Sequence, residues 1–373
     1  MKKEDVIALT RELIAFNTVN PPGNESDAAR FLGNLLSESG FNVEYIPFEK
    51  NRLHVIAEKG CQKDITPVVF SGHIDTVPLG AKEWNYSPFA GEIKDGKLFG
   101  RGSSDMKGGL AAMVVAAILA YEEGFSGGVR LILTSGEELG CQGALHLVAT
   151  HKDLGRAKGI IIGEPTANIP AIGHRGGLYL NLTTKGKTAH SSMPHFGDNA
   201  IYKAARAITK IEKFDFNVEA DPLLKFPTIN VGTIFGGMNI NSVPDHATFT
   251  IDIRSTTKVS HKELLKRLKE ELGSEIFIET LVDLPPVFSD ERDPFVQIIY
   301  GVCGISSGTC GFPHSLPYLT DGAVLQRAYN NAPTIILGPG QPEKAHQTDE
   351  FCYTKNLKHA VKIYKNILLN GEN

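Results

Sequence analysis

The chain has 373 residues and a formal net charge of -4; 42% of its residues are hydrophobic and 21% are charged. This composition is that of a soluble globular protein and excludes a disordered or fibrous chain. At roughly 150 residues per domain the length predicts two domains. The slightly acidic balance, without a basic cluster, argues against nucleic acid or an anionic membrane as a partner.

Residues 1–23 carry charges among apolar residues at helical spacing, which predicts an amphipathic helix and not a signal peptide. The longest apolar stretch, Leu110–Ala120, is well short of the roughly 20 residues that span a membrane. We therefore expect a cytoplasmic protein with no membrane partner. The five cysteines are scattered and form no C-x-x-C pair, so a metal would be bound by oxygen and nitrogen.

Up to about residue 172, helix-like segments alternate with short apolar runs. Three of these runs, in "TPVVFSG", "VRLILTSG" and "KGIIIGEPT", are continuously apolar and end in glycine and a polar group. Continuous hydrophobicity is typical of strands that are buried on both faces, so we predict an α/β domain with a mostly parallel sheet covered by helices. In such sheets the ligand crevice lies beyond the carboxyl ends of the strands.

The pattern changes near residue 175, where strands with one wet face are predicted. The segments "GLYLNLTTKG", "PTINVGTIFGG" and "HATFTIDIRS" alternate apolar and polar residues, and "DNAIYKAARAITKIE" and "SHKELLKRLKEELG" are helix-like. With the strand "EIFIETLVDLPP" the order fits an inserted α+β split βαβ (ferredoxin-like) domain. We predict a catalytic domain of residues 1–174 and 287–373 and a lid or dimerisation domain of residues 175–286. The first pattern resumes with "DPFVQIIYGVC", "PTIILGPG" and a terminal helix from about Lys355.

Acids and histidines gather where buried strands of the larger domain end. Each alone has an ordinary explanation, such as a turn, a helix cap or an early-helix acid. Together they form a cluster of negative charge that would repel itself unless positive charge lay within it. The residues are His73, Asp75, Asp105, Glu137, Glu138, Glu164 and His346.

A pair of divalent cations would explain this cluster. Zinc accepts histidine nitrogen and carboxylate oxygen, and two ions about 3.5 to 4 Å apart can share one carboxylate. Two histidines and three carboxylates supply the ligands. Asp75 could then accept the ring N–H of His73, and one of the pair Glu137 and Glu138 could take a proton from the attacking water while the other binds metal.

Several motifs along the whole chain resemble one enzyme family. They are "SGHIDTVP", "WNYSPFAGEIKDGKLFGRGSSDMKGG", "TSGEELGCQGA", "GEPT", "TAHSSMP" and "GPGQPEKAHQTDE". The set is similar to the co-catalytic zinc amidohydrolases and metallopeptidases that include acetylornithine deacetylase, succinyl-diaminopimelate desuccinylase, aminoacylase and glutamate carboxypeptidase. The first two are the most similar branch.

The resemblance implies roles for the clustered residues. It implies two Zn²⁺ per subunit, for which Co²⁺ or Mn²⁺ are possible substitutes, and a cis peptide bond between Asp105 and Met106. Glu137 would be the general base and Asp75 the partner of His73. By the same resemblance His73 and Glu164 would hold one zinc and Glu138 and His346 the other, with Asp105 as the bridge.

The resemblance also implies three functional residues in the smaller domain. Arg254, on the polar face of "TFTIDIRS", would bind the substrate carboxylate through its guanidinium fork. His190 in "TAHSSMP" would stabilise the oxyanion at the zinc site of a neighbouring subunit, which implies a homodimer formed through the lid domain. Asn241 would lie near the substrate, although "NSVP" stands where the family more often has "NVIP".

Two other motifs suggest a serine hydrolase or a nucleotide-binding protein. "GISSG", with Asp321 and His346 after it, has the chain order of an α/β-hydrolase triad, but Ser306 follows a helix-like segment and not a strand. "TKGKT" lacks the first glycine of a P-loop. A metal-binding homologue that has lost catalysis is a third possibility. The presence of Glu137 argues against it, because such a protein could most easily lose this residue.

The expected activity is metal-dependent hydrolysis of the amide bond of an N-acyl amino acid. N-acetylornithine and N-succinyl-diaminopimelate are the leading substrates by resemblance. A dipeptidase or carboxypeptidase of the same family is the alternative.

Overall fold

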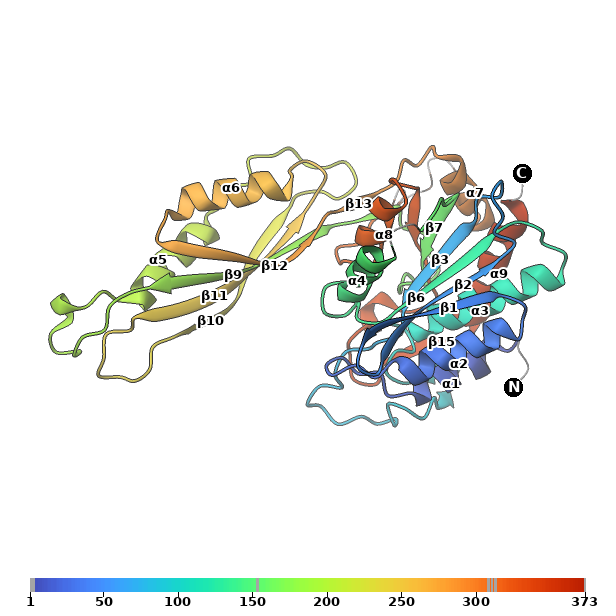
Figure 1. The fold of residues 1–373 in the computed structure, drawn as a ribbon, viewed down its shortest axis with the longest axis horizontal. Coiled ribbons are helices and arrows are strands. Elements are labelled where there is room, and N and C mark those ends of the chain that lie inside the picture. The colour runs from blue at the N-terminus through green and yellow to red at the C-terminus, as the bar shows by residue number, and fades with distance from the viewer. Residues whose placement is uncertain (1–3, 152–153, 307–308, 310, 312–313, 372–373) are drawn as a thin grey trace. The chain divides into compact units, whose positions relative to one another are not determined.

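The computed structural model describes residues 4–151, 154–306, 309, 311 and 314–371 (Figure 1). The chain divides into two compact units. The first comprises Met1–Gly173, Phe288–His314 and Thr320–Asn373, and the second comprises His174–Val287 and Ser315–Leu319. Residues 315–319 were assigned to the catalytic domain from sequence, but they join the smaller unit because Leu316 pairs with His174 and its carbonyl accepts a hydrogen bond from Arg175.

A six-stranded sheet forms the centre of the first unit, in the order β1-β2-β6-β3-β7-β14. The last four strands of this order are parallel to one another, and β2 is antiparallel to both of its neighbours. The predicted mostly parallel sheet is therefore confirmed. The strands are β1 (Asn42–Glu49), β2 (Arg52–Lys59), β3 (Val68–His73), β6 (Val129–Thr134), β7 (Gly159–Ile162) and β14 (Thr334–Ile336).

Helices cover both faces of this sheet, which explains the continuous apolar runs of β3, β6 and β7 (Figure 1). On one face lie α1 (Val6–Ala15), α2 (Ser26–Ser37), α3 (Lys107–Glu122) and α9 (Thr354–Asn370), and on the other lie α4 (Gln142–Thr150) and α8 (Gly322–Ala328). The apolar stretch 110–120 belongs to α3, where all of it except Leu119 is buried. Among the residues described, no helix combines the length and hydropathy needed to cross a bilayer.

The remaining elements of the first unit are short. Helix α7 (Pro294–Val302) begins at the predicted position, with Asp293 as its N-cap. A three-stranded sheet is formed by β15 (Phe351–Tyr353), β5 (Lys97–Phe99) and β4 (Ile93–Lys94). A 3₁₀ helix spans Pro342–Lys344, and β8 (Gly173–His174) pairs with β13 (Val287–Phe288) where the chain passes between the units.

The second unit is the predicted split βαβ arrangement. Its strands form a fully antiparallel sheet in the order β10-β11-β9-β12, and its core lies between this sheet and two helices. Strand β11 alternates as predicted, with Phe249, Ile251 and Ile253 buried. The elements are β9 (Gly176–Lys185), a 3₁₀ helix (Pro194–Phe196), α5 (Ala200–Glu212), β10 (Thr228–Gly236), β11 (His246–Ser255), α6 (His261–Leu272) and β12 (Ile276–Leu284).

Candidate metal centre

Three parallel strands bring the clustered residues to one edge of the sheet. His73 is the last residue of β3, Glu137 and Glu138 follow β6, and Glu164 follows β7. Since these strands are parallel neighbours, their carboxyl ends meet at the same edge. Asp105 lies just before α3 and is followed by the cis bond Asp105–Met106 that the resemblance implies.

The carboxylate of Asp105 lies between two histidines. Its Oδ1 is 3.2 Å from Nε2 of His73, and its Oδ2 is 3.3 Å from Nε2 of His346. Each histidine also faces a second carboxylate: His73 is 3.6 Å from Glu164, and His346 is 3.1 Å from Glu138. The five side chains thus form two groups that share Asp105, which is the arrangement expected of a bridging ligand.

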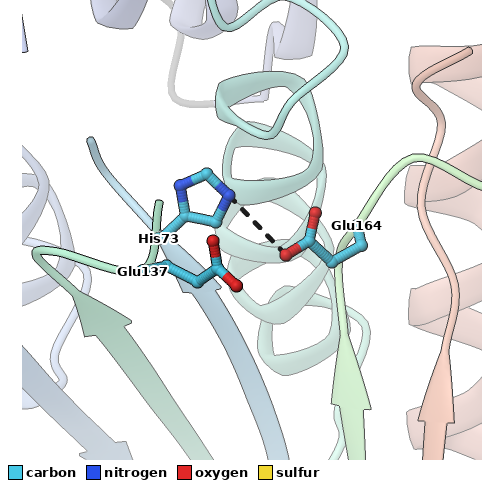
Figure 2. Close-up of side chains that lie close together, drawn as sticks. All are labelled: His73, Glu137 and Glu164. Atoms are coloured by element: carbon cyan, nitrogen blue, oxygen red, sulfur yellow. Dashed lines mark ion pairs between the residues drawn. The ribbon is translucent and has the colours of Figure 1, made fainter. Parts of the chain in front are cut away.

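The donor atoms are close enough to hold metal ions. One ligand atom each from His73, Asp105 and Glu138 lies within 4.8 Å of the others, and the same holds for His73, Glu137 and Glu164. Figure 2 shows the second group, in which the ion pair joins His73 to Glu164 and the Glu137 carboxylate points toward both. Oxygen and imidazole nitrogen are suitable ligands for zinc, manganese or cobalt.

The electrostatics of the cluster favour added positive charge. Burial, followed by the charge of Asp105, raises the pKa of Glu164 to about 8 and that of Glu138 to about 7. Hydrogen bonds to Asp105 and Glu138 raise the pKa of His346 to about 10. Oε1 of Glu138 is buried and has no hydrogen-bond partner among the residues described. Cations coordinated here would replace the bound protons and satisfy this oxygen, so the residues fit a metal pair.

Asp75 takes a different position from the one we predicted. Nδ1 of His73 contacts the main-chain carbonyl of Asp75 at 2.9 Å, and the nearest carboxylate oxygen of Asp75 is farther, at 3.6 Å. The carboxylate instead accepts hydrogen bonds from three successive main-chain N–H groups, those of Gly136, Glu137 and Glu138, at 2.8 to 3.2 Å. Asp75 therefore orients His73 through its backbone and holds the loop of both glutamates through its side chain.

Sequence reasoning missed Asn20 as a partner of Asp75. Its side-chain amide donates to Oδ2 of Asp75 at 2.9 Å, and both residues are buried. Asn20 precedes two successive cis-proline bonds, at Pro21 and Pro22. The "NPP" run was a visible signal of a special turn, but nothing local indicated contact with a residue 55 positions away.

Glu137 lies in a largely buried environment. Its side chain is accompanied by Cys141, whose thiol donates to Oε1 at 3.4 Å, and burial raises the pKa of Glu137 well above its usual value. A raised pKa makes a carboxylate a stronger proton acceptor when it is ionised. Asp321 lies near this pair and accepts a hydrogen bond from the Thr134 hydroxyl at 2.6 Å.

The predicted substrate residues of the second unit fall into two groups. His190 and Asn241 are exposed and lie side by side, because Ser191 N–H donates to the Asn241 carbonyl and His190 pairs with Ser242. Arg254 lies at the other end of β11 from the loop of Asn241. Arg254 is eight residue steps along the strand from His246, which corresponds to about 26 Å at roughly 3.3 Å per residue.

Local contacts determine the tautomer of His190 and the ion pairing of Arg254. Ser192 N–H donates to Nδ1 of His190 at 3.2 Å, so the neutral ring carries its proton on Nε2 and can donate it outward. The guanidinium of Arg254 is bound to Asp252, with an Nε–Oδ1 distance of 2.9 Å, and lies over the Tyr179 ring. A carboxylate ligand of Arg254 would therefore compete with Asp252.

The serine-hydrolase alternative is not supported by the described residues. Ser306 is exposed in the turn after α7, not at a strand-to-helix elbow, and Ser307 and Gly308 of the motif lie outside the described residues. Asp321 bonds to Thr134, and His346 faces Asp105 and Glu138. The "TKGKT" segment begins in the last two residues of β9, and no helix starts at its end, unlike in a P-loop.

Comparisons with known proteins agree with this geometry. The model of "Peptidase family M20/M25/M40" matches residues 69–370. A curated relative, a probable succinyl-diaminopimelate desuccinylase from Staphylococcus epidermidis, is 31% identical over 98% of both chains. An acetylornithine deacetylase from Vibrio vulnificus is 31% identical over 84% of this chain and 82% of the relative.

The fold is also that of solved structures. An M20 family metallo-carboxypeptidase from Sulfolobus solfataricus matches with a TM-score of 0.79 over 98% of both chains. Its sequence is only 20% identical, so this likeness shows the fold alone. The resemblance stated from the sequence motifs is confirmed.

Proposed function

We propose, since the chain belongs to the peptidase family M20/M25/M40, that this hydrolase of the family cleaves the amide bond of N-acyl amino acids. The observation that carries the proposal is the position of Asp105. Its two carboxylate oxygens lie within 3.3 Å of two different histidines, each of which has its own second carboxylate. Such a paired ligand set suits two divalent cations better than one.

Five side chains would hold the two cations, for which we propose zinc. His73 and Glu164 are assigned to one ion, Glu138 and His346 to the other, and Asp105 to both. When bound, the cations acidify water and polarise the substrate carbonyl. His346 is the most open of these ligands, with 54% of its side chain exposed, and marks the side of the cluster that faces solvent.

Glu137 is proposed as the general base. It lies among the candidate ligands, and burial raises its pKa, which makes the ionised carboxylate a stronger proton acceptor. Its carboxylate would take a proton from the attacking water and later give that proton to the leaving amine. Asp75 supports this role because its side chain bonds to the main-chain N–H of Glu137 and of both neighbours.

We propose that a homodimer completes each active site. His190 and Asn241 lie in loops beyond the His246 end of β11, and Arg254 lies near the other end, about 26 Å of strand from His246, which one small substrate does not bridge. A partner subunit would supply the first pair, with His190 donating from Nε2 to the oxyanion, while Arg254 binds the substrate carboxylate. The edge strand β10 supports an interface, since Ile234 and Phe235 are 50% and 68% exposed.

The substrate is proposed from the named relatives. N-succinyl-diaminopimelate and N-acetylornithine are the first candidates, because relatives at 31% identity carry the corresponding names. A dipeptide or a C-terminal peptide bond is the second candidate, favoured by the metallo-carboxypeptidase of the same fold. Both kinds of substrate have an amide carbonyl for the cations and a carboxylate for Arg254.

A substrate panel tests this proposal. Full-length protein loaded with zinc would be incubated with N-acetylornithine, N-succinyl-diaminopimelate and dipeptides, and the released amine identified by mass spectrometry. We expect turnover of one class, loss of turnover with a chelator, and none with Glu137→Gln. A zinc-loaded protein that is inert on the whole panel would instead indicate a binding homologue without catalysis.

A further inference from the structure

Glu350 is a fully buried acid that no step of the proposed reaction uses. It lies four residues after His346, immediately before β15, and its exposed fraction is 0%. Its Oε1 accepts hydrogen bonds from the main-chain N–H groups of Ser104, at 2.8 Å, and Asp105, at 3.0 Å. Its Oε2 accepts from Gly102 N–H at 3.1 Å and from the Arg101 guanidinium at 2.7 Å.

Further hydrogen bonds tie the same two segments together. The Glu350 carbonyl accepts from Gly100 N–H at 2.9 Å, and the Ser104 hydroxyl donates to the Phe351 carbonyl at 2.7 Å. The chain that carries Asp105 is therefore fixed against the chain that follows His346. Both segments contribute a candidate ligand, and Glu350 joins them.

We propose that Glu350 is a positioning residue for the metal pair. Its carboxylate fixes the main chain of Asp105 so that one carboxylate oxygen faces His73 and the other faces His346, where the cations would be held. This inference rests on the proposed function, since it assigns Glu350 a role in the same metal centre. Asp75 makes the comparable arrangement on the other side, with its carboxylate on the N–H groups of Gly136, Glu137 and Glu138.

The four donors require a carboxylate and not merely a polar group of the same size. Each oxygen of Glu350 faces two donors. A glutamine in its place would turn an NH₂ group toward two of them in either orientation of the amide. Two hydrogen bonds would be lost and two donors would face another donor, so the Asp105 loop must move.

Glu25 provides a matched control in the same unit. It is also 0% exposed, and its carboxylate pairs with the buried Arg52 at 2.7 Å, just as Glu350 pairs with the buried Arg101. Its hydrogen bonds come from Arg52 and not from the Asp105 loop. Glu25→Gln therefore weakens a buried ion pair of similar burial without disturbing the amides that Glu350 holds.

The experiment compares full-length wild type, Glu350→Gln and Glu25→Gln. Zinc affinity and stoichiometry would be measured by competition with a chromophoric chelator, and thermal unfolding would be followed without added metal. We expect Glu350→Gln to weaken zinc binding at one site or both by about 10 to 100-fold, which is the usual effect of losing a residue that orients a metal ligand. Glu25→Gln should lower the unfolding temperature by a similar amount and keep wild-type zinc affinity.

The ligand geometry gives a second readout. In the Co²⁺-loaded protein, Glu350→Gln should change the visible d–d absorption bands, whereas Glu25→Gln should not. If Glu350→Gln does not fold, Glu350→Asp replaces it, because it keeps both oxygens on an arm one methylene shorter. We expect Glu350→Asp also to weaken zinc binding, by less than the glutamine variant would.

Two failures are distinguishable. If wild type binds zinc but Glu350→Gln, or Glu350→Asp in its place, binds both ions as tightly and with unchanged cobalt bands, Glu350 has no positioning role. If wild type itself binds no zinc, the proposed metal centre is wrong, and the positioning role is overturned with it.

Discussion

Most of the proposed metal ligands of the first unit are buried, whereas His190 and Asn241, proposed substrate residues of the second unit, are exposed. His73, Asp105 and Glu164 are at most 8% exposed and contact one another directly. His190 and Asn241 lie in exposed loops, next to Ile240, which is 99% exposed. The first unit thus holds these groups in fixed contacts, while His190 and Asn241 of the second unit are open to solvent.

The proposed function places the metal chemistry in the first unit and the contacts to the substrate and its oxyanion in the second. Changes in the buried cluster should abolish chemistry or metal binding within each subunit. Changes in the exposed loops should be rescued by a second subunit. The predictions below test this division, beginning with the largest effect.

Replacing Glu137 should give the largest loss. We expect Glu137→Gln to lower kcat by about 10² to 10⁴-fold while zinc content is unchanged, because a general base is removed and no assigned ligand is lost. Steady-state kinetics and metal analysis of the same sample measure both quantities. A fall in zinc content with high residual activity would mean that Glu137 and Glu138 have exchanged roles.

Replacing His190 should lower activity by about 10² to 10³-fold, the loss typical of an oxyanion donor. Mixing His190→Ala with Glu137→Ala should then restore activity, because a hybrid dimer has one site with both groups intact. With random pairing half the dimers are hybrids, each with one of two sites working, so about a quarter of wild-type activity should return. No recovery despite proven subunit exchange would place His190 in its own subunit's site or in none.

Replacing Asp75 should have a smaller effect, which falls on both zinc affinity and kcat. Asp75→Ala removes the acceptor of three main-chain N–H groups and should weaken both zinc affinity and kcat by about 10 to 100-fold. His73→Ala should weaken zinc binding more. Equal losses of zinc affinity in the two variants would indicate that the Asp75 carboxylate is itself a ligand.

The pH dependence of zinc binding tests the same cluster without any substitution. Glu164 and Glu138, with pKa values raised to about 8 and about 7, hold protons that a cation must displace. Zinc affinity should therefore fall as the pH is lowered through 8 and 7, by about tenfold per pH unit for each proton displaced. Calorimetry in buffers of different ionisation enthalpy should detect proton release at pH 7, and zinc binding without proton release would contradict the raised pKa values.

The sequence predicts the sheet and the clustered residues because both depend on local pattern. Continuous apolar runs indicated β3, β6 and β7, and the residues directly after them became neighbours because the strands are parallel. The alternation of β11 likewise predicted which of its residues are buried.

Other features could not be predicted because they depend on main-chain hydrogen bonds between distant segments. Glu350 bonds to the N–H of Asp105, 245 residues away, and such a bond leaves no mark on the residue type of its partner. The Asp75 carboxylate was assigned to the nearby His73 for the same reason, although its partners are the amides after β6. Residues 315–319 joined the second unit through a pairing with His174 that no local pattern indicates.

The position of bound zinc tests the central claim most directly. Crystals of the zinc-loaded protein would be measured at the zinc absorption edge, and the anomalous difference map would locate the ions. We predict two peaks about 3.5 to 4 Å apart, one beside His73 and Glu164 and one beside His346 and Glu138, with an oxygen of Asp105 on each. A single peak, or two peaks that do not share Asp105, would contradict the proposed metal pair.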